Sequence, residues 1–593
     1  MSLGSRYETR GLPEAKALRG ILRPIAAGFL IGLFMGFVDS YGYAVSGYTV
    51  AEIDLVVIPV IARLLLGRSA DPREIFIATV TAFGISLSTV ITSGMLITYY
   101  LTSKIYWLFY RESDFPGWLY SGSQACFPNI FVCEWPYTYL SLAALSLVGV
   151  GFAYILRHVF LDKLNLPYPL GMASAMIARL ISLIRTQRTI ILVIISGIAI
   201  QMILIISPPG SLDLTPVFTS SGYGILASLS FDLPIFLIAL LLPPRVSVSI
   251  GGGSIVTGLI LLPIGASLYL YRVSPGASSD NLVTAASWYL ASIVFGTVFS
   301  LMLLVARSVW APISHTARTI IESRRDKLLL AMLLLSLLMI LALAYLRSGA
   351  PGPSYIFFGL ILMLIIVPLL IIITSWGAGE AGTVSQAFYP TSTVYMYLTG
   401  YRGFAPYVYM DHYLGIPMPS SLSASSLHIL RASRILGISP TFILSMFSLS
   451  FLIGSLITIY YGYLLINIYG NNPERMPLDR WIPYTLWSLS VYRGELDSKS
   501  ILPGAVIGVL VMMLLAIVDR LTGKSFSPIP FIIGLTLTTD LGILFILGSF
   551  LRWFVSKFGG GAEKQLMIVT SSLLAGVGIA IAIYTVFNAI ALI

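Results

Sequence analysis

The sequence predicts an all-α polytopic membrane protein with about 14–16 transmembrane helices in two halves, some of them re-entrant or broken. Of its 593 residues, 57% are hydrophobic and only 10% are charged, whereas a typical soluble chain is about 25% charged. The apolar residues gather in segments of roughly 20, the length that crosses a bilayer as a helix. So few charges could not cover a soluble protein of this length, which excludes a cytosolic enzyme, a nucleic-acid binder and a disordered scaffold.

The first half, residues 1–306, is expected to contain about eight spans and one segment of a different kind, near residues 167–184. This segment, Pro167–Ile184, is apolar but lies between Lys163 and Arg185 and contains Arg179. Basic residues collect on one side of a membrane, so it is expected to enter and leave on the same face, as a re-entrant or surface helix. The expected spans are Ile25–Gly47, a short Ile53–Leu66, Ile75–Leu101, Tyr137–Leu156, Thr189–Ser207, Gly222–Leu242, Val246–Tyr271 and Val283–Ala306.

The charges predict an orientation. Residues 307–327 form a basic linker between the halves. A cytoplasmic N-terminus followed by eight full spans returns this linker to the cytoplasm, as the positive-inside rule expects. We therefore expect a multi-pass protein of the cell membrane with its N-terminus in the cytoplasm. The same count places the loop that contains both cysteines, Cys126 and Cys133, outside; a local disulfide and two free thiols both remain open.

The second half, residues 328–593, contains a long stretch that is too polar for an ordinary span. Residues Gly377–Pro440 are rich in Gly, Pro, Ser and Tyr. Irregular backbone at membrane depth persists only where protein buries it or where it lines a wet cavity, so broken helices around a central site are expected. Two halves of about eight elements each suggest a duplicated transporter layout. The other expected spans are Leu328–Leu346, Tyr355–Trp376, Thr441–Ile468, Ile501–Val518, Ile529–Leu551 and Leu566–Leu592.

Three aspartates are candidates for carrying a coupling proton or cation. Asp39 follows a stripe of glycines that lets a neighbouring helix approach closely, Gly28, Gly32 and Gly36. Asp232, in SLSFDLPIFL, and Asp540, in LTLTTDLGILF, are expected in the middle of spans. A carboxylate at membrane depth is costly unless it is paired or functional. The alternatives are an interfacial position for Asp39, and helix capping or an Asp–Arg pair for the other two.

Two glycine-rich segments are candidates for substrate binding. Glycines around Glu380 suit an unwound backbone that exposes its polar groups to a ligand, and the polar side chains that follow could complete such a site: Ser385, Gln386, Tyr389 and Tyr395. Gly251, Gly252 and Gly253 could open a helix whose N-terminus holds an anion such as a substrate carboxylate. The alternatives are an ordinary turn at Glu380 and close helix packing at the three glycines.

No pattern in the sequence indicates catalysis, a resident metal or a cofactor. The four histidines have no ligand spacing, and two cysteines are too few for a zinc site. Gly523-Lys524-Ser525 resembles the end of a phosphate loop, but position 518 is Val518 rather than glycine. Asp411 precedes His412, and a local hydrogen bond is an adequate explanation for that pair. We expect no enzyme, no bound cofactor and no metal site.

Several segments in order resemble the oligopeptide transporter superfamily, which includes the yellow-stripe-like metal-chelate transporters, with most likeness to its prokaryotic branch. The element Pro167-Tyr168-Pro169, with Gly171 two positions later, is similar to a feature of the family's first half. The resemblance implies proton-coupled import of small peptides or metal–chelate complexes. The similar segments are Asp71–Glu74, Leu164–Ile181, Leu242–Ile264, Phe526–Thr539 and Trp553–Ala582.

We therefore predict a secondary transporter that takes up a small peptide or metal chelate by proton symport. Its expected partners are this small-molecule substrate and membrane lipid, not nucleic acid, and a homo-oligomer is left open. Two alternatives from other classes are a membrane-embedded transferase acting on a lipid-linked substrate and a non-transporting subunit of a larger complex.

Overall fold

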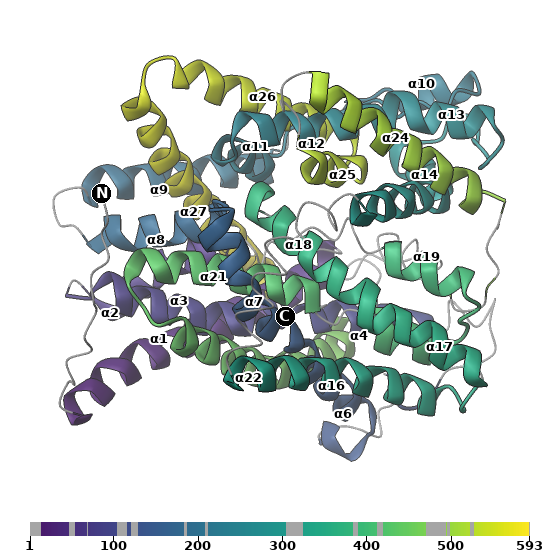
Figure 1. Cartoon of the computed structure of the whole chain (residues 1–593). Coiled ribbons are helices and arrows are strands. Elements are labelled where there is room, and N and C mark those ends of the chain that lie inside the picture. The colour runs from purple at the N-terminus through teal and green to yellow at the C-terminus, as the bar shows by residue number, and fades with distance from the viewer. Residues whose placement is uncertain are drawn as a thin grey trace.

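Long apolar segments become helices because, in lipid, each backbone N–H must find its acceptor within its own segment. The computed structural model follows this rule (Figure 1). It describes residues 14–46, 54–67, 69–102, 116–119, 129–182, 187–207, 212–303, 324–382, 390–411, 419–469, 491, 494, 499–521 and 527–591. Within these residues, the only strands form one antiparallel pair that aligns Leu212 with Leu229 and Asp213 with Ser228. The all-α polytopic class is confirmed.

Eleven helices in the described part of the chain are long and apolar enough to cross a membrane. A twelfth crossing results if Ser279–Ala285 and Ser287–Leu303, which meet at an angle of 64°, form one broken span. The sequence-based number of about 14–16 stays a prediction, because the gaps at 304–323 and 470–490 are not described. Most of the basic linker, 307–327, lies in the first of these gaps.

The elements before residue 304 are helices and one pair of short strands. They are α1 (Glu14–Ser46), α2 (Asp54–Leu66), α3 (Pro72–Leu87), α4 (Val90–Thr102), η4 (Ile130–Val132), α6 (Trp135–Ser146), α7 (Val148–Arg157), η5 (His158–Lys163), α8 (Pro169–Ser182), α9 (Gln187–Ile206), β1 (Leu212–Asp213), α10 (Thr215–Ser220), β2 (Ser228–Leu229), α11 (Leu233–Leu241), α12 (Pro244–Val256), η6 (Thr257–Leu261), α13 (Leu262–Ser267) and α14 (Ser279–Ala285).

The elements after the gap include several short helices between long ones. They are α16 (Arg324–Arg347), α17 (Pro353–Ile361), η7 (Leu362–Ile366), α18 (Val367–Ala381), α19 (Pro390–Leu398), α20 (Phe404–Pro406), η9 (Tyr407–Asp411), α21 (Pro419–Leu436), α22 (Pro440–Tyr469), α24 (Ile501–Leu521), α25 (Pro528–Leu535), α26 (Thr539–Ser556) and α27 (Gly560–Ala591).

Two expected spans are wrong as continuous helices. The segment 222–242 becomes helical only at Leu233, because Asp232 caps the short helix α11 and β2 precedes it. The segment 529–551 is divided after Leu535 into α25 and α26, and of these only α26 passes as a span. Hydrophobicity alone cannot separate one long helix from a short helix joined to another apolar segment.

The glycine stripe of α1 is a packing surface against α3. A Cβ atom at Gly28 would lie 2.4 Å from the backbone oxygen of Ala78, and one at Gly32 would lie 2.7 Å from Cδ1 of Ile85. A Cβ atom at Gly36 would make an ordinary 3.5 Å contact. Two of the three glycines are therefore needed for the close approach of the two helices.

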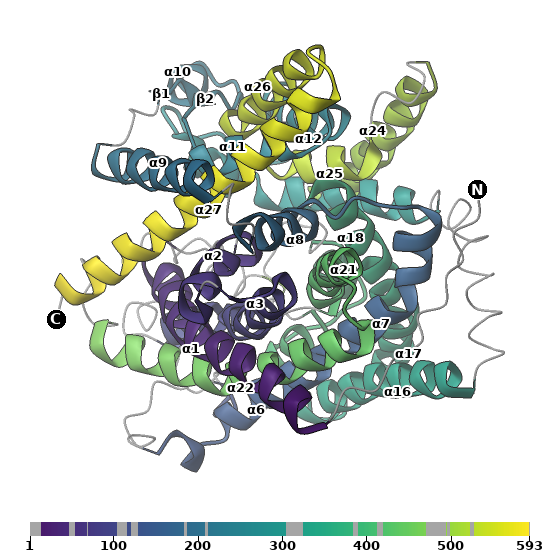
Figure 2. The ribbon, with the colours of Figure 1, turned by 90° about the vertical axis from the view of Figure 1, so that its left-hand side faces the viewer.

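Helix α21 lies inside the bundle, in contact with α7, α8, α18 and α22 (Figure 2). Its sequence, PSSLSASSLHILRASRIL, is rich in serine and does not pass as a lipid-facing span. Surrounding protein buries most of its side chains, including five serines and His428. This is the environment in which a polar helix can exist at membrane depth.

The last turn of α21 contacts both ends of the segment that precedes and includes α8. Arg434 donates a hydrogen bond to the Leu161 carbonyl oxygen at 3.1 Å, and Arg179 donates one to that of Ile435. Helix α8 itself begins beside His428. At 1.5 Å per residue, His428 lies about 10 Å along α21 from Arg434 and Ile435. These contacts fit a re-entrant segment; that Pro167–Ile184 enters and leaves on one membrane face stays a prediction.

Helices distant in sequence pair throughout the bundle. Helices α1 and α3 pack against α22, α9 packs along α27, and α12 packs between α25 and α26 (Figure 2). The glycines of α12 serve the last of these contacts, because a Cβ atom at Gly253 would lie 2.2 Å from the Phe531 backbone oxygen. The division into halves at 306 and 328 stays a prediction.

Candidate functional site

Asp39 is one of two buried carboxyl groups that share a serine. It lies in α1, beyond the glycine stripe, and is 4% exposed. The hydroxyl of Ser86 in α3 lies 2.6 Å from Asp39 Oδ2 and also hydrogen-bonds Oδ2 of Asp54, the first residue of α2, which is 2% exposed. The two carboxyl groups also interact directly with each other. Asp39 is therefore buried within protein; its depth in the membrane, and with it the interfacial alternative, stays a prediction.

The geometry of this pair implies a bound proton. A serine hydroxyl carries one hydrogen and can donate it to only one acceptor. A second hydrogen bond at Ser86 then requires that the other carboxyl group supply the hydrogen. Two buried carboxylates in contact also repel each other strongly unless one is neutral. We term Asp39, Asp54 and Ser86 the carboxyl pair site; its geometry suits one protonated and one ionised carboxyl group.

Further hydroxyl groups lie near the carboxyl pair site at the break between α3 and α4. Ser88 lies 2.7 Å from Thr458 of α22, and Thr92 donates to Ser40 at 3.0 Å. All four side chains are fully buried, and the span Pro72–Tyr99 is the most enclosed of the candidate spans. The polar groups satisfy one another in the interior of the bundle, away from lipid.

The other two candidate aspartates lie close together at helix N-termini. Asp232 caps α11, and its Oδ1 accepts a hydrogen bond from the Ile235 amide at 2.8 Å. Asp540 lies in the first turn of α26 and accepts hydrogen bonds from Ser228 and Ser230 next to β2. Their carboxylates repel each other. The sequence placed both in the middle of spans, but they lie at helix N-termini. Capping and the helix dipole fit these positions.

Glu380 lies in the last turns of α18, in regular helix rather than unwound backbone. Its carboxylate accepts hydrogen bonds from the Trp376 indole at 2.9 Å and from the hydroxyl of Ser527, the N-cap residue of α25. Helix α18 ends at Gly382, whose φ of +79° suits glycine. Tyr395 donates to the Phe358 carbonyl oxygen at 3.0 Å. Three other candidates lie outside the described residues: Ser385, Gln386 and Tyr389.

Gly251, Gly252 and Gly253 lie in the interior of α12, about two turns after its first residue, Pro244. Their amides are therefore not the free N–H groups of a helix N-terminus. A Cβ atom at Gly251 would lie 2.6 Å from the Gly542 backbone oxygen of α26. The contacts support close helix packing; binding of a substrate by these glycines stays a prediction.

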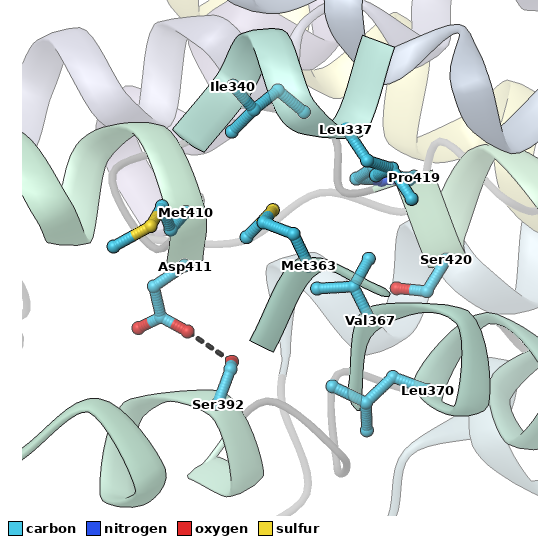
Figure 3. A pocket seen from close by; sticks show the side chains of 10 residues that line it. All are labelled: Leu337, Ile340, Met363, Val367, Leu370, Ser392, Met410, Asp411, Pro419 and Ser420. Atoms are coloured by element: carbon cyan, nitrogen blue, oxygen red, sulfur yellow. Dashed lines mark hydrogen bonds between the residues drawn. The ribbon is translucent and has the colours of Figure 1, made fainter. Parts of the chain in front are cut away.

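A buried carboxylate that the sequence did not single out lies beside a cavity (Figure 3). Asp411, at the end of η9, is fully buried and accepts hydrogen bonds from Ser392 and, at 2.5 Å, from Thr393 in the first turn of α19. The cavity measures about 20 Å³, room for roughly one water molecule. Its lining is otherwise mostly apolar: Leu337, Ile340, Met363, Val367, Leu370, Met410, Pro419 and Ser420.

This cavity fits a small cationic or hydrogen-bond-donating group. Its one carboxylate is held by two hydroxyl groups, and apolar side chains from α16, η7 and α18 surround the open space. In the sequence, a local hydrogen bond to the neighbouring histidine is an adequate explanation for Asp411, so Asp411 was not a candidate. His412 itself lies outside the described residues. The tyrosine-rich run YVYMD could have indicated this site, because it is too polar for a lipid-facing segment and ends in an acid.

The histidine, cysteine and acidic side chains of the described residues were compared with the needs of a metal site. In the described ranges, no three His, Cys, Asp or Glu side chains gather as metal ligands would. Cys133 is disulfide-bonded, and Cys126, the only other cysteine of the chain, lies outside those ranges.

An enclosed bundle of apolar helices, with carboxyl groups buried between them and a small interior cavity, defines a polytopic membrane transport protein. The chain belongs to the OPT oligopeptide transporter protein family, whose model matches residues 79–588. It is thus a transporter of oligopeptides or related small molecules rather than a membrane-embedded transferase. No curated protein matches the chain.

Proposed function

We propose that the protein takes up small peptides, or metal–chelate complexes, across the cell membrane together with protons. Family membership provides the general class of substrate; the proton and the direction are inferred. The observation that carries the coupling is the carboxyl pair site, where Asp39 and Asp54 share the hydroxyl of Ser86 in the interior of the bundle. Binding and release of its proton changes the charge between α1, α2 and α3.

This change of charge can drive a conformational change. When the shared proton leaves, two negative charges remain in contact in a site with little water, which is unfavourable by several kcal/mol. The helices that hold the pair then separate or admit water until the charges are solvated. Because α1 and α3 both pack against α22, such a movement is transmitted to the second half of the chain.

We assign the substrate to the region between the Asp411 cavity and the end of α18. Asp411 suits the ammonium group of a peptide or a cationic chelate. Helix α19 hydrogen-bonds Asp411 through Ser392. The proposed substrate-binding residues occur in sequence within α19 or shortly before it: Glu380, Ser385, Gln386, Tyr389 and Tyr395. Gly251–Gly253, Asp232 and Asp540 keep their proposed roles in substrate binding and ion coupling, with less support from their contacts.

We also propose that the N-terminus lies in the cytoplasm. The disulfide at Cys133 supports this orientation, because disulfides persist mainly on the oxidising, outer side of a membrane. The basic linker then lies in the cytoplasm, as the positive-inside rule favours.

Uptake into proteoliposomes under an imposed inward proton gradient tests the coupling. We expect the gradient to stimulate uptake of at least one member of a panel of short peptides and metal chelates. Asp39→Asn and Asp54→Asn should remove this stimulation and preserve exchange of substrate across the membrane without a gradient. An amide retains the shape of the protonated carboxyl group but carries no exchangeable charge.

The matched control is Asp213→Asn, since Asp213 lies in the β1–β2 hairpin and accepts hydrogen bonds from the Thr215 and Ser279 amides. This variant should remain gradient-dependent. If the wild-type protein shows no gradient dependence with any substrate, proton coupling is wrong. If uptake by the wild type depends on the gradient and both Asn variants retain this dependence, the carboxyl pair site has a structural role.

A further inference from the structure

Four arginines gather around the last two turns of α21. Two of them, Arg431 and Arg434, belong to α21 and lie almost one turn apart on it. Arg179 of α8 donates a hydrogen bond to the Ile435 carbonyl oxygen, and Arg73 of α3 donates one to the next carbonyl oxygen at 3.1 Å. Three helices that are distant in sequence thus bring guanidinium groups to the same end of α21. We term the four residues the arginine cluster: Arg73, Arg179, Arg431 and Arg434.

Little negative charge balances the arginine cluster. Among the described residues, its only ion pair joins Arg434 to Asp162, which also pairs with His158. The other three arginines contact uncharged oxygen atoms: two backbone carbonyl oxygens and the side-chain oxygen of Asn165. Each guanidinium group has five N–H donors, so these contacts use a minority of the donors. The cluster therefore carries an excess of positive charge that suits an anion.

Arg431 is the member of the cluster whose contacts are least complete. Its Nη1 atom donates to Asn165 at 3.1 Å, whereas its Nε atom is buried and has no hydrogen-bond partner in the described part of the chain. A buried donor on a charged group is costly to leave unpaired. Arg434 lies on the same face of α21, and the two like charges repel each other. An anion bound by both side chains removes the repulsion and offers the acceptor that Arg431 lacks.

The N-terminus of a long helix follows directly after the cluster in the chain. Helix α22 begins at Pro440, four residues after Leu436, and the amides of a first helical turn have no acceptor within their own helix. Arg73 lies beside the connection, because its Nη2 atom would be 3.3 Å from a Cβ atom at Gly437. Helix N-termini and guanidinium groups both bind phosphate, and arginine can do so with two parallel hydrogen bonds.

The cluster lies at the opposite end of a membrane span from the disulfide. This span runs from Trp135, which follows Cys133, to Lys163 beside Asp162. In the proposed orientation the cluster therefore faces the cytoplasm, as the positive-inside rule favours. Helices α3, α7, α8, α18 and α22 surround α21 (Figure 2), so its end opens in the middle of this face rather than at the lipid-facing rim.

We propose that the arginine cluster binds the phosphate group of a small dissolved molecule of the cytoplasm. Such a group accepts hydrogen bonds from arginines of α3, α8 and α21 at once and neutralises part of their charge. It thereby ties the first turn of α3 to α8 and α21. Because α3 also carries Ser86 of the carboxyl pair site, the bound phosphate restrains the helix that coupling must move. The proposal rests on the proposed function only in naming the cytoplasm and the coupling movement.

The first test measures binding of radiolabelled inorganic phosphate to the purified protein in detergent by equilibrium dialysis. Both ends of the bundle are accessible in detergent, so the result depends neither on the orientation nor on transport. We expect saturable binding that weakens at least about tenfold in Arg179→Gln and in Arg73→Gln, since each loses charge-assisted hydrogen bonds. The matched control is Arg272→Gln, an exposed arginine after α13, which lies far from α21 in Figure 1.

The control should bind phosphate as the wild type does. If the wild type shows no saturable binding, the proposal is wrong. If binding weakens equally in all three variants, net charge alone attracts the phosphate and the cluster is not its site. Should a glutamine variant not fold, Arg179→Lys replaces it: lysine keeps the charge but lacks the planar fork, so binding should still weaken.

The second test separates a dissolved phosphate from a lipid headgroup. Thermal unfolding is compared in potassium phosphate, in potassium chloride of equal ionic strength, and in mixed micelles that contain phosphatidylglycerol. We expect phosphate to raise the melting temperature of the wild type and of Arg272→Gln by several degrees more than that of Arg179→Gln. An equal rise in all three is the general stabilisation by phosphate salts and contradicts a site. A rise that needs Arg179 but occurs only with phosphatidylglycerol assigns the cluster to lipid and overturns the proposal.

Discussion

At the scale of single residues, Ser86 determines how two acids coexist in a space with little water. We predict that Ser86→Ala lowers the free energy of unfolding by about 1–3 kcal/mol, because both carboxyl groups lose a hydrogen bond. The control is Ser455→Ala in α22, where an equally buried hydroxyl only donates to the Phe451 carbonyl oxygen one turn back. Its removal should be nearly neutral. Chemical unfolding in detergent compares them; equal effects would argue against a special role for Ser86.

Asp232 offers a second test, because its capping role and its proposed coupling role predict different behaviour of the same variant. As an N-cap, it can be replaced by Asn with little loss, whereas Asp232→Ala should cost about 0.5–2 kcal/mol of stability. If Asp232 only caps α11, Asp232→Asn should unfold like the wild type and keep gradient-driven uptake. Loss of the gradient dependence in a stable Asp232→Asn protein would instead assign the coupling proton to Asp232.

The sequence identified the acids that are energetically costly at membrane depth better than it identified the residues that bind them. Asp39 could be identified because an acid beside a packed glycine stripe must be paired or functional. Its partners, Asp54 and Ser86, could not, since three helices must first be placed side by side. Asp411 was missed for the same reason: Ser392 and Thr393, which hold it, precede it by 19 and 18 residues and belong to another helix.

At the scale of elements, glycine spacing predicted a helix contact that the structure contains. We predict that Gly28→Ala destabilises the protein by roughly 1–3 kcal/mol, because its methyl group would collide with the Ala78 backbone. Gly36→Ala in the same stripe should be neutral or stabilising by up to about 1 kcal/mol, since it has room and alanine favours helix. Thermal unfolding of both variants checks this contrast; similar melting temperatures would contradict it.

Helix ends were harder to predict than helices. The segment around Asp232 reads as one apolar span, yet Pro234 and a capping aspartate begin a helix there. The segment after Pro528 likewise divides at Thr536–Thr538. In both places the chain turns where a second helix from the far part of the sequence packs against it, which no local pattern specifies.

At the scale of the whole molecule, the orientation can be tested at Cys133. A membrane-impermeant maleimide applied to intact cells should label the protein only after a reducing agent has opened the disulfide. Cys133→Ser, which leaves Cys126 as the one cysteine, should be labelled without reduction. Labelling of the reduced wild type only in permeabilised cells would place this loop inside and reverse the proposed topology.

The pairing of distant helices also has a consequence for synthesis in the cell. Helix α9 packs along α27, which begins roughly 350 residues later. At a translation rate of about 5–20 residues per second, α9 waits roughly 20–70 s in the membrane before its partner is made. Until then the face of α9 that includes Gly197, and that later meets Leu573 and Gly576, lacks its partner helix.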